Sequence, residues 1–437
     1  MKTVITPFKW IVFAATVFAA TAARATGDAP LPRPLTLDAA LAYGAEHNPA
    51  LLRASESIRE QEGVLIQARA SQLPSLTASG SYTRTEDSLL ESPFYEKRSW
   101  SIDVTARQLL YAGGGPRAQI RSERERLEAA RLGFTAVLNG TMLALRQQFH
   151  VVLLDREIIA VHEEALRVLE MALQQAHARR DVGTGSDFDV LRAEVSVANE
   201  KPALIRARNA CRVAQDQLRV TLGAPAVKGV VTDLDVRGSL ALPRRNGDLE
   251  AALSAARAQR PELARQNRLI AAAEQGVTSA RSGYLPTVNA LAGYEWVGPS
   301  LTTTPDNHLK GWAAGVQSSW AIFDGRATAA KVRQSQSRLK QAKLSETELQ
   351  LSVDLDVRQA FSALTEADEL LVSSEKVVDQ ARESLRLAQT RLQAGTATQL
   401  DILQAQSALT DARSNLAQAQ YSNIVATFSL QRAVGSR

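Results

Sequence analysis

The chain of 437 residues contains one cysteine, Cys211, and only five histidines. A single cysteine cannot form an internal disulfide framework, so packing has to hold the fold together. The histidines are scattered, at His47, His150, His162, His177 and His308. Because their spacing is not typical of a metal site, we expect no metal and no cofactor. We expect Cys211 to be buried as a small apolar group.

Long apolar runs are also missing. The longest, residues 10–20, follows two lysines and is far shorter than the ~20 residues that a helix needs to cross a bilayer. It is followed by a small-x-small cleavage site that ends at Ala25, which predicts that residues 1–25 are a signal peptide. We therefore expect an exported protein and, if it is a membrane protein, not a helical one. The mature chain would begin at Thr26, without an N-terminal cysteine for a lipid.

Charge of one sign does not dominate, since 51 basic and 46 acidic residues give a formal net charge of +5. The two signs are interleaved, and no basic block with interleaved aromatic residues is present, so we expect no nucleic-acid partner. Nothing resembles a nucleophile beside a base, a phosphate-binding loop or a catalytic acid pair. We therefore expect that the protein is not an enzyme.

What the sequence does contain is an internal repeat at a constant spacing of 212 residues, as from Leu37 to Leu249. Three further residues recur at the same spacing: Pro74 corresponds to Pro286, Trp100 to Trp312 and Gly183 to Gly395. Two copies of one unit therefore build the molecule, and its function is that of a duplicated device. We predict a first repeat at 26–223, an inter-repeat linker at the waist at 224–247, and a second repeat at 248–437.

Each repeat has a helical pattern before and after a pair of strands. In the first copy we predict a helix from Thr36 to about Gln72, a second of about 65 residues that ends before Gly183, and a third over 187–222. The third helix of the second copy is expected over 399–434. Apolar residues follow at intervals of seven, which is typical of a coiled coil, at Leu145, Val152, Ile159, Leu166 and Leu173 and at Val357, Leu364, Leu371, Val378 and Leu385.

The two shorter helices together are about as long as the single long one. We therefore expect them to stack end to end beside it, with strands at one end of the unit and helical turns at the other. Pro202 lies inside the third helix, where it removes a backbone donor, so we expect a kink or a break there.

Four segments alternate polar and less polar residues with the period of a strand. Each has about nine to eleven residues, the length of a tilted strand that crosses a bilayer. Aromatic residues lie near the segment ends, where an interfacial girdle would be, at Tyr82, Trp100, Tyr294, Trp296 and Trp312. The polar faces, which include Asp103 and Arg107, suit a water-filled lumen.

Four strands are too few to close a barrel. Unpaired backbone groups at an open edge cost several kcal/mol each in lipid, so the chain is expected to oligomerise. Eight strands enclose a lumen that side chains fill, whereas three chains give twelve strands around a wider one.

This order of segments resembles the TolC-like outer-membrane efflux family. Paired motifs flank the strands and form the helical turns, at Leu73-Pro74 and Leu285-Pro286, at 110–114 and 322–325, and at 182–191 and 394–403. The likeness covers about residues 35 to 436. No single motif is very specific, but their fixed order occurs twice.

The resemblance implies an α+β membrane protein whose long antiparallel coiled-coil helices form an α-helical periplasmic tunnel. Four β-strands per chain would contribute to a twelve-stranded outer-membrane β-barrel in a homotrimer. Such a channel passively conducts substrates outward in a tripartite efflux or type I secretion system. Its partners would be outer-membrane lipid, a periplasmic adaptor (membrane fusion protein) and an inner-membrane pump of the ABC or RND class.

The resemblance also implies that the helical turns form the periplasmic tip, which gates the tunnel and contacts the adaptor. The candidate gating residues are Gly183, Asp187, Asp189, Arg192, Arg391, Gly395, Asp401 and Gln404. Some relatives have an acidic residue where this chain has Arg192 and Gln404, so the sequence does not predict an acidic ring at that level. A simpler interpretation of Asp189 and Asp401 is that they favour helix N-termini.

A different class of protein also fits the heptads, namely an exported coiled-coil structural or adaptor protein that forms no pore. The strand pairs favour the channel, because a soluble coiled coil has no use for four segments of membrane length. The cargo stays open among drugs, metals, polysaccharides and proteins.

Overall fold

The computed structural model describes residues 31–86, 98–224, 233–241, 248–298 and 309–436. The expected signal peptide at 1–25, the loops between paired strands and much of the inter-repeat linker lie outside these residues. Within the described part, no helix has a stretch both long and apolar enough to cross a membrane.

Two long helices dominate the structure, α3 (Gly115–Asp181) and α7 (Ala327–Gln393), each of 67 residues. At ~1.5 Å per residue each is about 100 Å long. α3 begins with Pro116 in its first turn, where the missing N–H has no intrahelical partner to lose. The third helices are α4 (Asp187–Leu222) and α8 (Gln399–Val434), as the sequence predicts.

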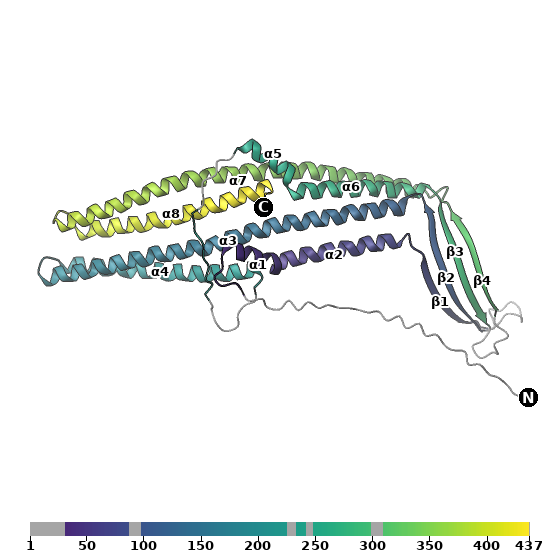
Figure 1. Ribbon diagram of the computed structural model, residues 1–437, viewed down its shortest axis with the longest axis horizontal. Helices are drawn as coiled ribbons and strands as arrows, with labels where there is room; N and C mark the ends of the chain where they lie inside the picture. The colour runs from purple at the N-terminus through teal and green to yellow at the C-terminus, as the bar shows by residue number, and fades with distance from the viewer. Residues whose placement is uncertain (1–30, 87–97, 225–232, 242–247, 299–308, 437) are drawn as a thin grey trace, which may run out of the picture. The chain divides into compact units, whose positions relative to one another are not determined.

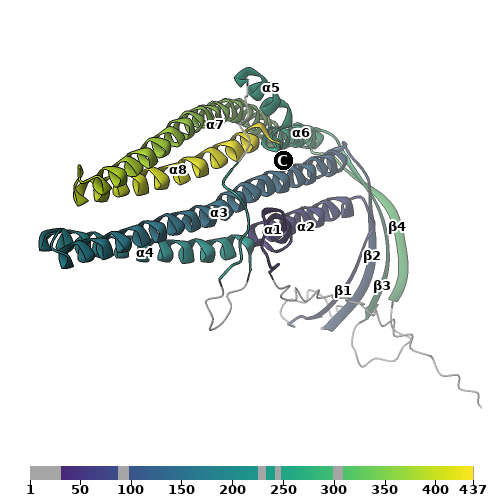
Figure 2. The same cartoon turned by 60° about the vertical axis from the view of Figure 1, so that its left-hand side comes forward.

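The helices lie side by side in a layer (Figures 1 and 2). α3 contacts α2 (Pro49–Ala70) and α4 on one side and α6 (Pro261–Arg281) and α8 on the other, and α7 contacts α6 and α8. α3 therefore has a pair of shorter helices on each side, and α7 has one such pair. In each pair, one helix covers the strand half of the long helix and the other covers its turn half. This confirms that the shorter helices stack beside the long ones.

The expected single helix over 36–72 is wrong, because the chain breaks at Asn48. α1 (Leu37–His47) and α2 (Pro49–Ala70) are separate helices. Asn48 is extended and its Oδ1 accepts from the N–H groups of Ala50 and Leu51, at 2.8 and 3.3 Å. The second copy breaks likewise, into α5 (Leu249–Gln259) and α6 (Pro261–Arg281), with the short η2 (Ser282–Tyr284) after it.

These breaks are where the stacked helices meet. Asn48 Nδ2 donates to the Thr221 carbonyl at the end of α4, at 2.6 Å, and Arg260 Nε donates to the Ala433 carbonyl at the end of α8, at 2.7 Å. Each side chain thus satisfies an orphan carbonyl of the helix that ends against it. Gly223 ends α4 at φ 75°, and a Cβ there would lie 2.2 Å from the His47 carbonyl oxygen.

Of the expected kink or break at Pro202, the break is wrong, because α4 runs unbroken from Asp187 to Leu222. The kink stays a prediction. Pro202 is exposed, and so is Ala198, whose carbonyl loses its partner. Water can therefore satisfy that carbonyl. Val197 and Leu204, on either side of the proline, are buried, so packing holds both halves of the helix.

The heptad positions form the seams between helices. Val152 and Val357 are fully buried, and Val378 and Leu385 pack in one cluster with Ile402 of α8. Cys211 is buried as expected, and burial raises the pKa of its thiol.

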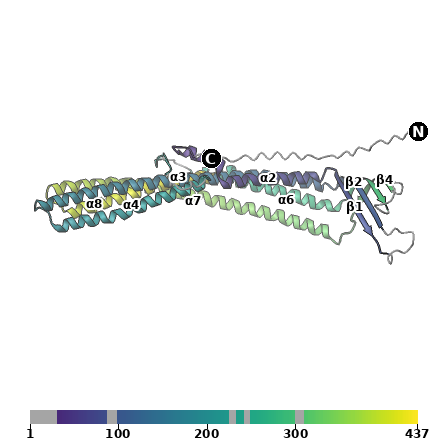
Figure 3. The same ribbon diagram turned by 90° about the horizontal axis from the view of Figure 1, so that it is seen from below.

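The strands form one antiparallel sheet in the order β1-β2-β3-β4. They are β1 (Ser75–Arg84), β2 (Arg98–Ala112), β3 (Thr287–Gly298) and β4 (Leu309–Ser319). Figure 3 shows the sheet beside the ends of α2 and α6. Since β2 leads into α3 and the turn follows the far end of α3, the sheet and the turn lie at opposite ends of this helix.

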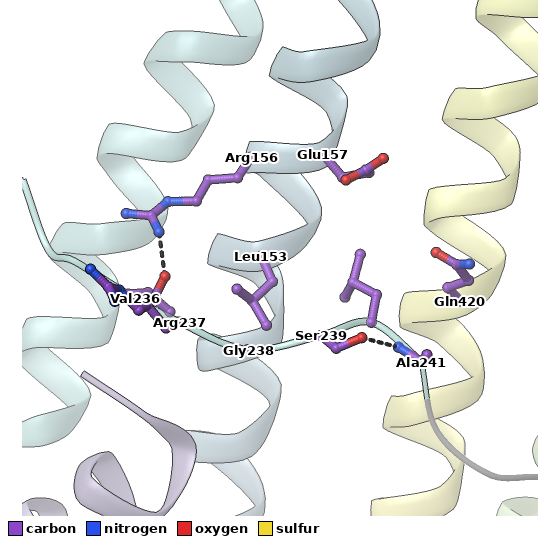
Figure 4. Close-up of a pocket in the computed structure, with 10 residues that line it drawn as sticks. Leu153, Arg156, Glu157, Val236, Arg237, Gly238, Ser239, Ala241 and Gln420 are labelled. Atoms are coloured by element: carbon purple, nitrogen blue, oxygen red, sulfur yellow. Dashed lines mark hydrogen bonds between the residues drawn. The ribbon is translucent and has the colours of Figure 1, made fainter. Parts of the chain in front are cut away.

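The described part of the linker, residues 233–241, crosses the middle of α3 (Figure 4). The Arg156 guanidinium donates to the carbonyls of Leu234 and Val236, and Val236 pairs with Leu35 in a parallel bridge. The linker, α3 and Gln420 of α8 line a cavity of about 550 Å³. The linker thus lies against both copies.

Candidate functional site

The sheet has one polar face, to which β1 and β2 contribute hydrogen-bonded side chains. Ser79 Oγ donates to Asp103 Oδ1 at 2.6 Å, and the hydroxyls of Ser81 and Ser101 are 2.9 Å apart. Thr105 Oγ1 donates to Asp103 Oδ2 at 3.3 Å. Arg107 alternates onto the same face and pairs in register with Ser75. This face can line a water-filled passage.

The opposite face carries the aromatic residues. Register pairs Tyr82 with Trp100, Trp296 with Ile102, and Tyr294 with Trp312, so all five aromatic candidates share this face. The ring centroids of Tyr294 and Trp296 are 4.4 Å apart. Trp312 is 78 % exposed, so within one chain this apolar face is uncovered. Such a face suits lipid rather than water.

The sheet is open within one chain. Neither β1 nor β4 pairs with another described strand on its outer edge, and every residue of both strands is exposed. A row of unpaired N–H and C=O groups is a template for another strand.

The first helical turn joins α3 to α4. Gly183 has φ 75°, and the Arg179 carbonyl accepts from the N–H of Thr184 at 2.9 Å. Ser186 then caps α4 in a capping box with Asp189. Asp187 is exposed, and the Arg192 guanidinium lies 4.5 Å from the Phe188 ring centroid.

The second turn repeats this geometry between α7 and α8. Gly395 has φ 74°, the Arg391 carbonyl accepts from the Thr396 N–H at 2.9 Å, and Thr398 and Asp401 form a capping box. Hydrogen bonds from the Thr398 backbone and hydroxyl, and the charge of Arg391, lower the pKa of Asp401.

The structure thus gives Asp189 and Asp401 a local role, since each completes the capping box in the first turn of its helix. Among the described residues, no hydrogen bond or ion pair joins the first turn to the second. The copies meet instead through packing, because Leu403 of α8 lies in a buried cluster with Leu169 and Val197. Gln404 is exposed next to it.

Two residues at the turns were not singled out from the sequence. Phe188 is 62 % exposed, and a large aromatic residue within a polar turn was the available signal. Gln399 is buried, and its Nε2 has no hydrogen-bond partner among the described residues. Nothing in the sequence marked Gln399 as a buried residue. Its counterpart in the first copy, Asp187, is also polar and is exposed.

An open sheet with one polar and one apolar face, joined to long helices that end in paired turns, defines a subunit of an outer-membrane channel. The model of the outer membrane efflux protein family matches residues 44–224 and 252–436, and the chain belongs to this family. It matches twice, once in each copy.

Individual relatives agree with this membership. The chain is 25 % identical to the outer membrane efflux protein BepC of Brucella suis biovar 1 over 413 residues, which are 94 % of this chain and 87 % of BepC. It is 22 % identical to TolC of Vibrio cholerae, covering 90 % of this chain and 88 % of TolC. The solved outer-membrane channel OprN superposes with a TM-score of 0.78 at 20 % identity, covering 92 % of this chain and 90 % of that one.

The resemblance to TolC-like proteins is therefore confirmed, together with the fold class of helical tunnel and barrel sheet. The alternative of a coiled-coil protein that forms no pore is excluded by the family.

Proposed function

We propose that three copies of this chain form the passive exit duct of a tripartite efflux or type I secretion system. The observation that carries this proposal is the open four-stranded sheet, which presents a polar face, an aromatic face and two unpaired edges. Twelve strands from three chains satisfy those edges and enclose a lumen wide enough for water.

The helices support the same assembly. The outer helices of the layer keep apolar residues uncovered, at Leu52 and Ile66 on α2 and at Leu344, Leu351 and Leu355 on α7. The three α7 leucines recur at intervals of seven and four, so they share one helix face. A neighbouring copy that packs its α2 against this face would cover both sets and continue the layer into a tunnel.

The envelope location follows from the same proposal. Residues 1–25 are removed as a signal peptide, the first repeat spans 26–223, the linker 224–247 lies at the equator, and the second repeat is 248–437. The sheet lies in outer-membrane lipid and the helices extend into the periplasm, without an N-terminal lipid. The duct performs no catalysis and binds no nucleic acid.

The partners are a periplasmic adaptor and an inner-membrane pump of the ABC or RND class. The helical turns contact the adaptor and gate the tunnel, through Gly183, Asp187, Asp189, Arg192, Arg391, Gly395, Asp401 and Gln404. The glycines at positive φ let the turns change conformation.

Planar-bilayer recording and native mass measurement of the detergent-extracted protein test the duct together. We expect discrete conducting steps and a mass three times that of the mature chain. A stable monomer without conductance contradicts the proposal. N-terminal sequencing of the same sample is expected to start at Thr26.

A further inference from the structure

Seven basic residues gather where the helices meet the sheet, at the ends of α2 and α6 and the beginnings of α3 and α7. We call them the basic collar: Arg69, Arg117, Arg121, Arg281, Arg326, Lys331 and Arg333. All seven are exposed. At ~1.5 Å per residue, those on α3 and α7 lie within about 9 Å of the helix starts.

Among the described residues, the collar holds no ion pair of the kind that several arginines form further along the helices. Further along the helices, arginines pair with nearby acids, as Arg131 does with Glu128 at 2.9 Å and Arg386 with Glu383 at 2.6 Å. No collar residue forms an ion pair with a residue that the structure describes. Asp324, at the start of α7, is already engaged, since its Oδ2 accepts from the Thr328 N–H at 2.7 Å.

Two collar residues also oppose the dipoles of their own helices. Arg117 lies in the first turn of α3, and Arg326 is the residue before α7. A cation at a helix N-terminus is disfavoured by the positive end of the dipole. Neither charge forms an ion pair with a residue that the structure describes, so an anion outside the chain would stabilise both.

An uncovered apolar band adjoins the collar on the side of the sheet. Its exposed members are Leu110, Tyr111, Tyr284, Trp320, Ile322 and Phe323. Leu110, Tyr111 and Arg117 help to line a single cavity of about 280 Å³, which therefore combines apolar walls with a guanidinium. Aromatic residues beside basic ones are typical of the boundary between acyl chains and headgroups.

A groove along the first turns of α7 continues the collar. Arg326, Arg333 and Arg338 line it, and its volume is about 1010 Å³. Guanidinium groups bind phosphate oxygens through two parallel hydrogen bonds. The open groove can take phosphate groups held at a surface, but it has no enclosed pocket for a small free ion.

We propose that the basic collar binds the anionic phospholipid headgroups of the periplasmic leaflet, while the apolar band lies against their acyl chains. This inference rests on the proposed function, because it requires the sheet to lie in the outer membrane. Charge complementarity and continuity with the apolar face of the sheet support lipid as the occupant.

The test compares lipid binding by detergent-extracted wild-type trimer and two triple variants, measured by native mass spectrometry with phosphatidylglycerol or phosphatidylcholine. The collar variant is Arg326→Gln, Lys331→Gln and Arg333→Gln. The control removes three cations of the same helix that lie about 20 to 47 Å from its start, through Lys340→Gln, Lys343→Gln and Arg358→Gln.

We expect the wild type to prefer phosphatidylglycerol and to lose this preference at high salt. The collar variant is expected to bind phosphatidylglycerol at least about tenfold more weakly, and the control to stay within about twofold of the wild type. Millimolar inorganic phosphate should not displace the lipid, whereas displacement would identify a site for free phosphate.

Other outcomes overturn the inference. A wild type without preference for the anionic lipid, or equal losses in both variants, contradicts it. A change in the ion selectivity of the pore with unchanged lipid binding would place these cations in the lumen. If the collar variant does not assemble, the wild type alone tests the inference: its preference for phosphatidylglycerol must be present at low salt and lost at high salt. A wild type that does not conduct contradicts the proposed function instead.

Discussion

Asp155, near the middle of α3, is the residue whose titration the packing changes most clearly. It is half-buried, and burial raises its pKa from 3.8 to about 6. Burial raises the pKa of Tyr421 on α8, and the charge of Asp155 adds to this effect. Because the folded pKa exceeds the unfolded one, the destabilising effect is absent below about pH 3.8 and complete above about pH 6.

We therefore predict that Asp155→Asn stabilises the protein above pH 6 and has little effect at pH 4. The full shift corresponds to about 3 kcal/mol, which partial solvent screening reduces to about 1 kcal/mol. Melting temperatures across this pH range measure the effect, with the exposed Asp411→Asn as the control. A gain of equal size at both pH values would contradict the assignment to charge burial.

At the scale of the elements, space for a side chain is tighter where the stacked helices meet than in the helical turns. Gly223 and Gly183 both have φ 75°. A Cβ on Gly223 would lie 2.2 Å from the His47 carbonyl oxygen, whereas a Cβ on Gly183 would meet nothing within 4 Å.

We predict that Gly183→Ala costs only the backbone strain of about 1 to 2 kcal/mol, while Gly223→Ala costs more and separates α4 from α2. Denaturant unfolding of both variants, with hydrogen exchange at the α1–α2 junction, checks this. Equal losses in the two variants would mean that the joint adapts to the added carbon.

The helical turns are the second element with a testable role. Exposed charged contacts contribute about 0 to 1 kcal/mol each, so several around a trimer can hold a closed state that the adaptor reverses. We predict that Arg192→Ser with Arg391→Ser raises single-channel conductance and antibiotic leakage and leaves the trimer intact.

The matched control is Arg382→Ser with Arg386→Ser, whose arginines pair with acids of their own helix at 3.3 and 2.6 Å. The control should conduct like the wild type. Unchanged conductance in the turn variant would indicate that packing, such as that around Leu403, holds the tip.

At the scale of the whole molecule, one chain leaves its functional surfaces incomplete. Among the described strands, the two outer ones have no partner on their outer edges, and Leu351 on α7 is 68 % exposed. We predict that Leu351→Glu lowers the stability of the trimer without unfolding the chain, because it places a charge where a neighbouring copy would pack. Native mass measurement over a dilution series checks this, with the exposed Lys376→Glu as the control. A variant trimer as stable as the wild type would contradict the assignment of this face to the interface.

The amino-acid sequence by itself determined the elements of this protein. Glycines, caps and heptads defined α3, α4, α7 and α8 closely, because these signals act within a few residues of the chain. Alternation of polar and less polar residues likewise defined four strands, but it was the register of the sheet that brought the aromatic residues onto one face. The spacing of 212 residues established the duplication before any contact was known.

Only the tertiary structure decided what depends on partners distant in the chain. Asn48 caps α2 and donates to the carbonyl of Thr221, 173 residues away, so the helix break there also connects α2 to the end of α4. α4 continues through Pro202 because Val197 and Leu204 on either side are buried, while Pro202 itself and Ala198, whose carbonyl it leaves unpaired, are exposed to water. The capping roles of Asp189 and Asp401 depend on hydrogen bonds between residues three apart in the chain. The absence of a hydrogen bond between the two turns, among the described residues, depends instead on how the helices pack side by side. Contacts between distant residues follow from the packing of whole faces, which local sequence patterns do not specify.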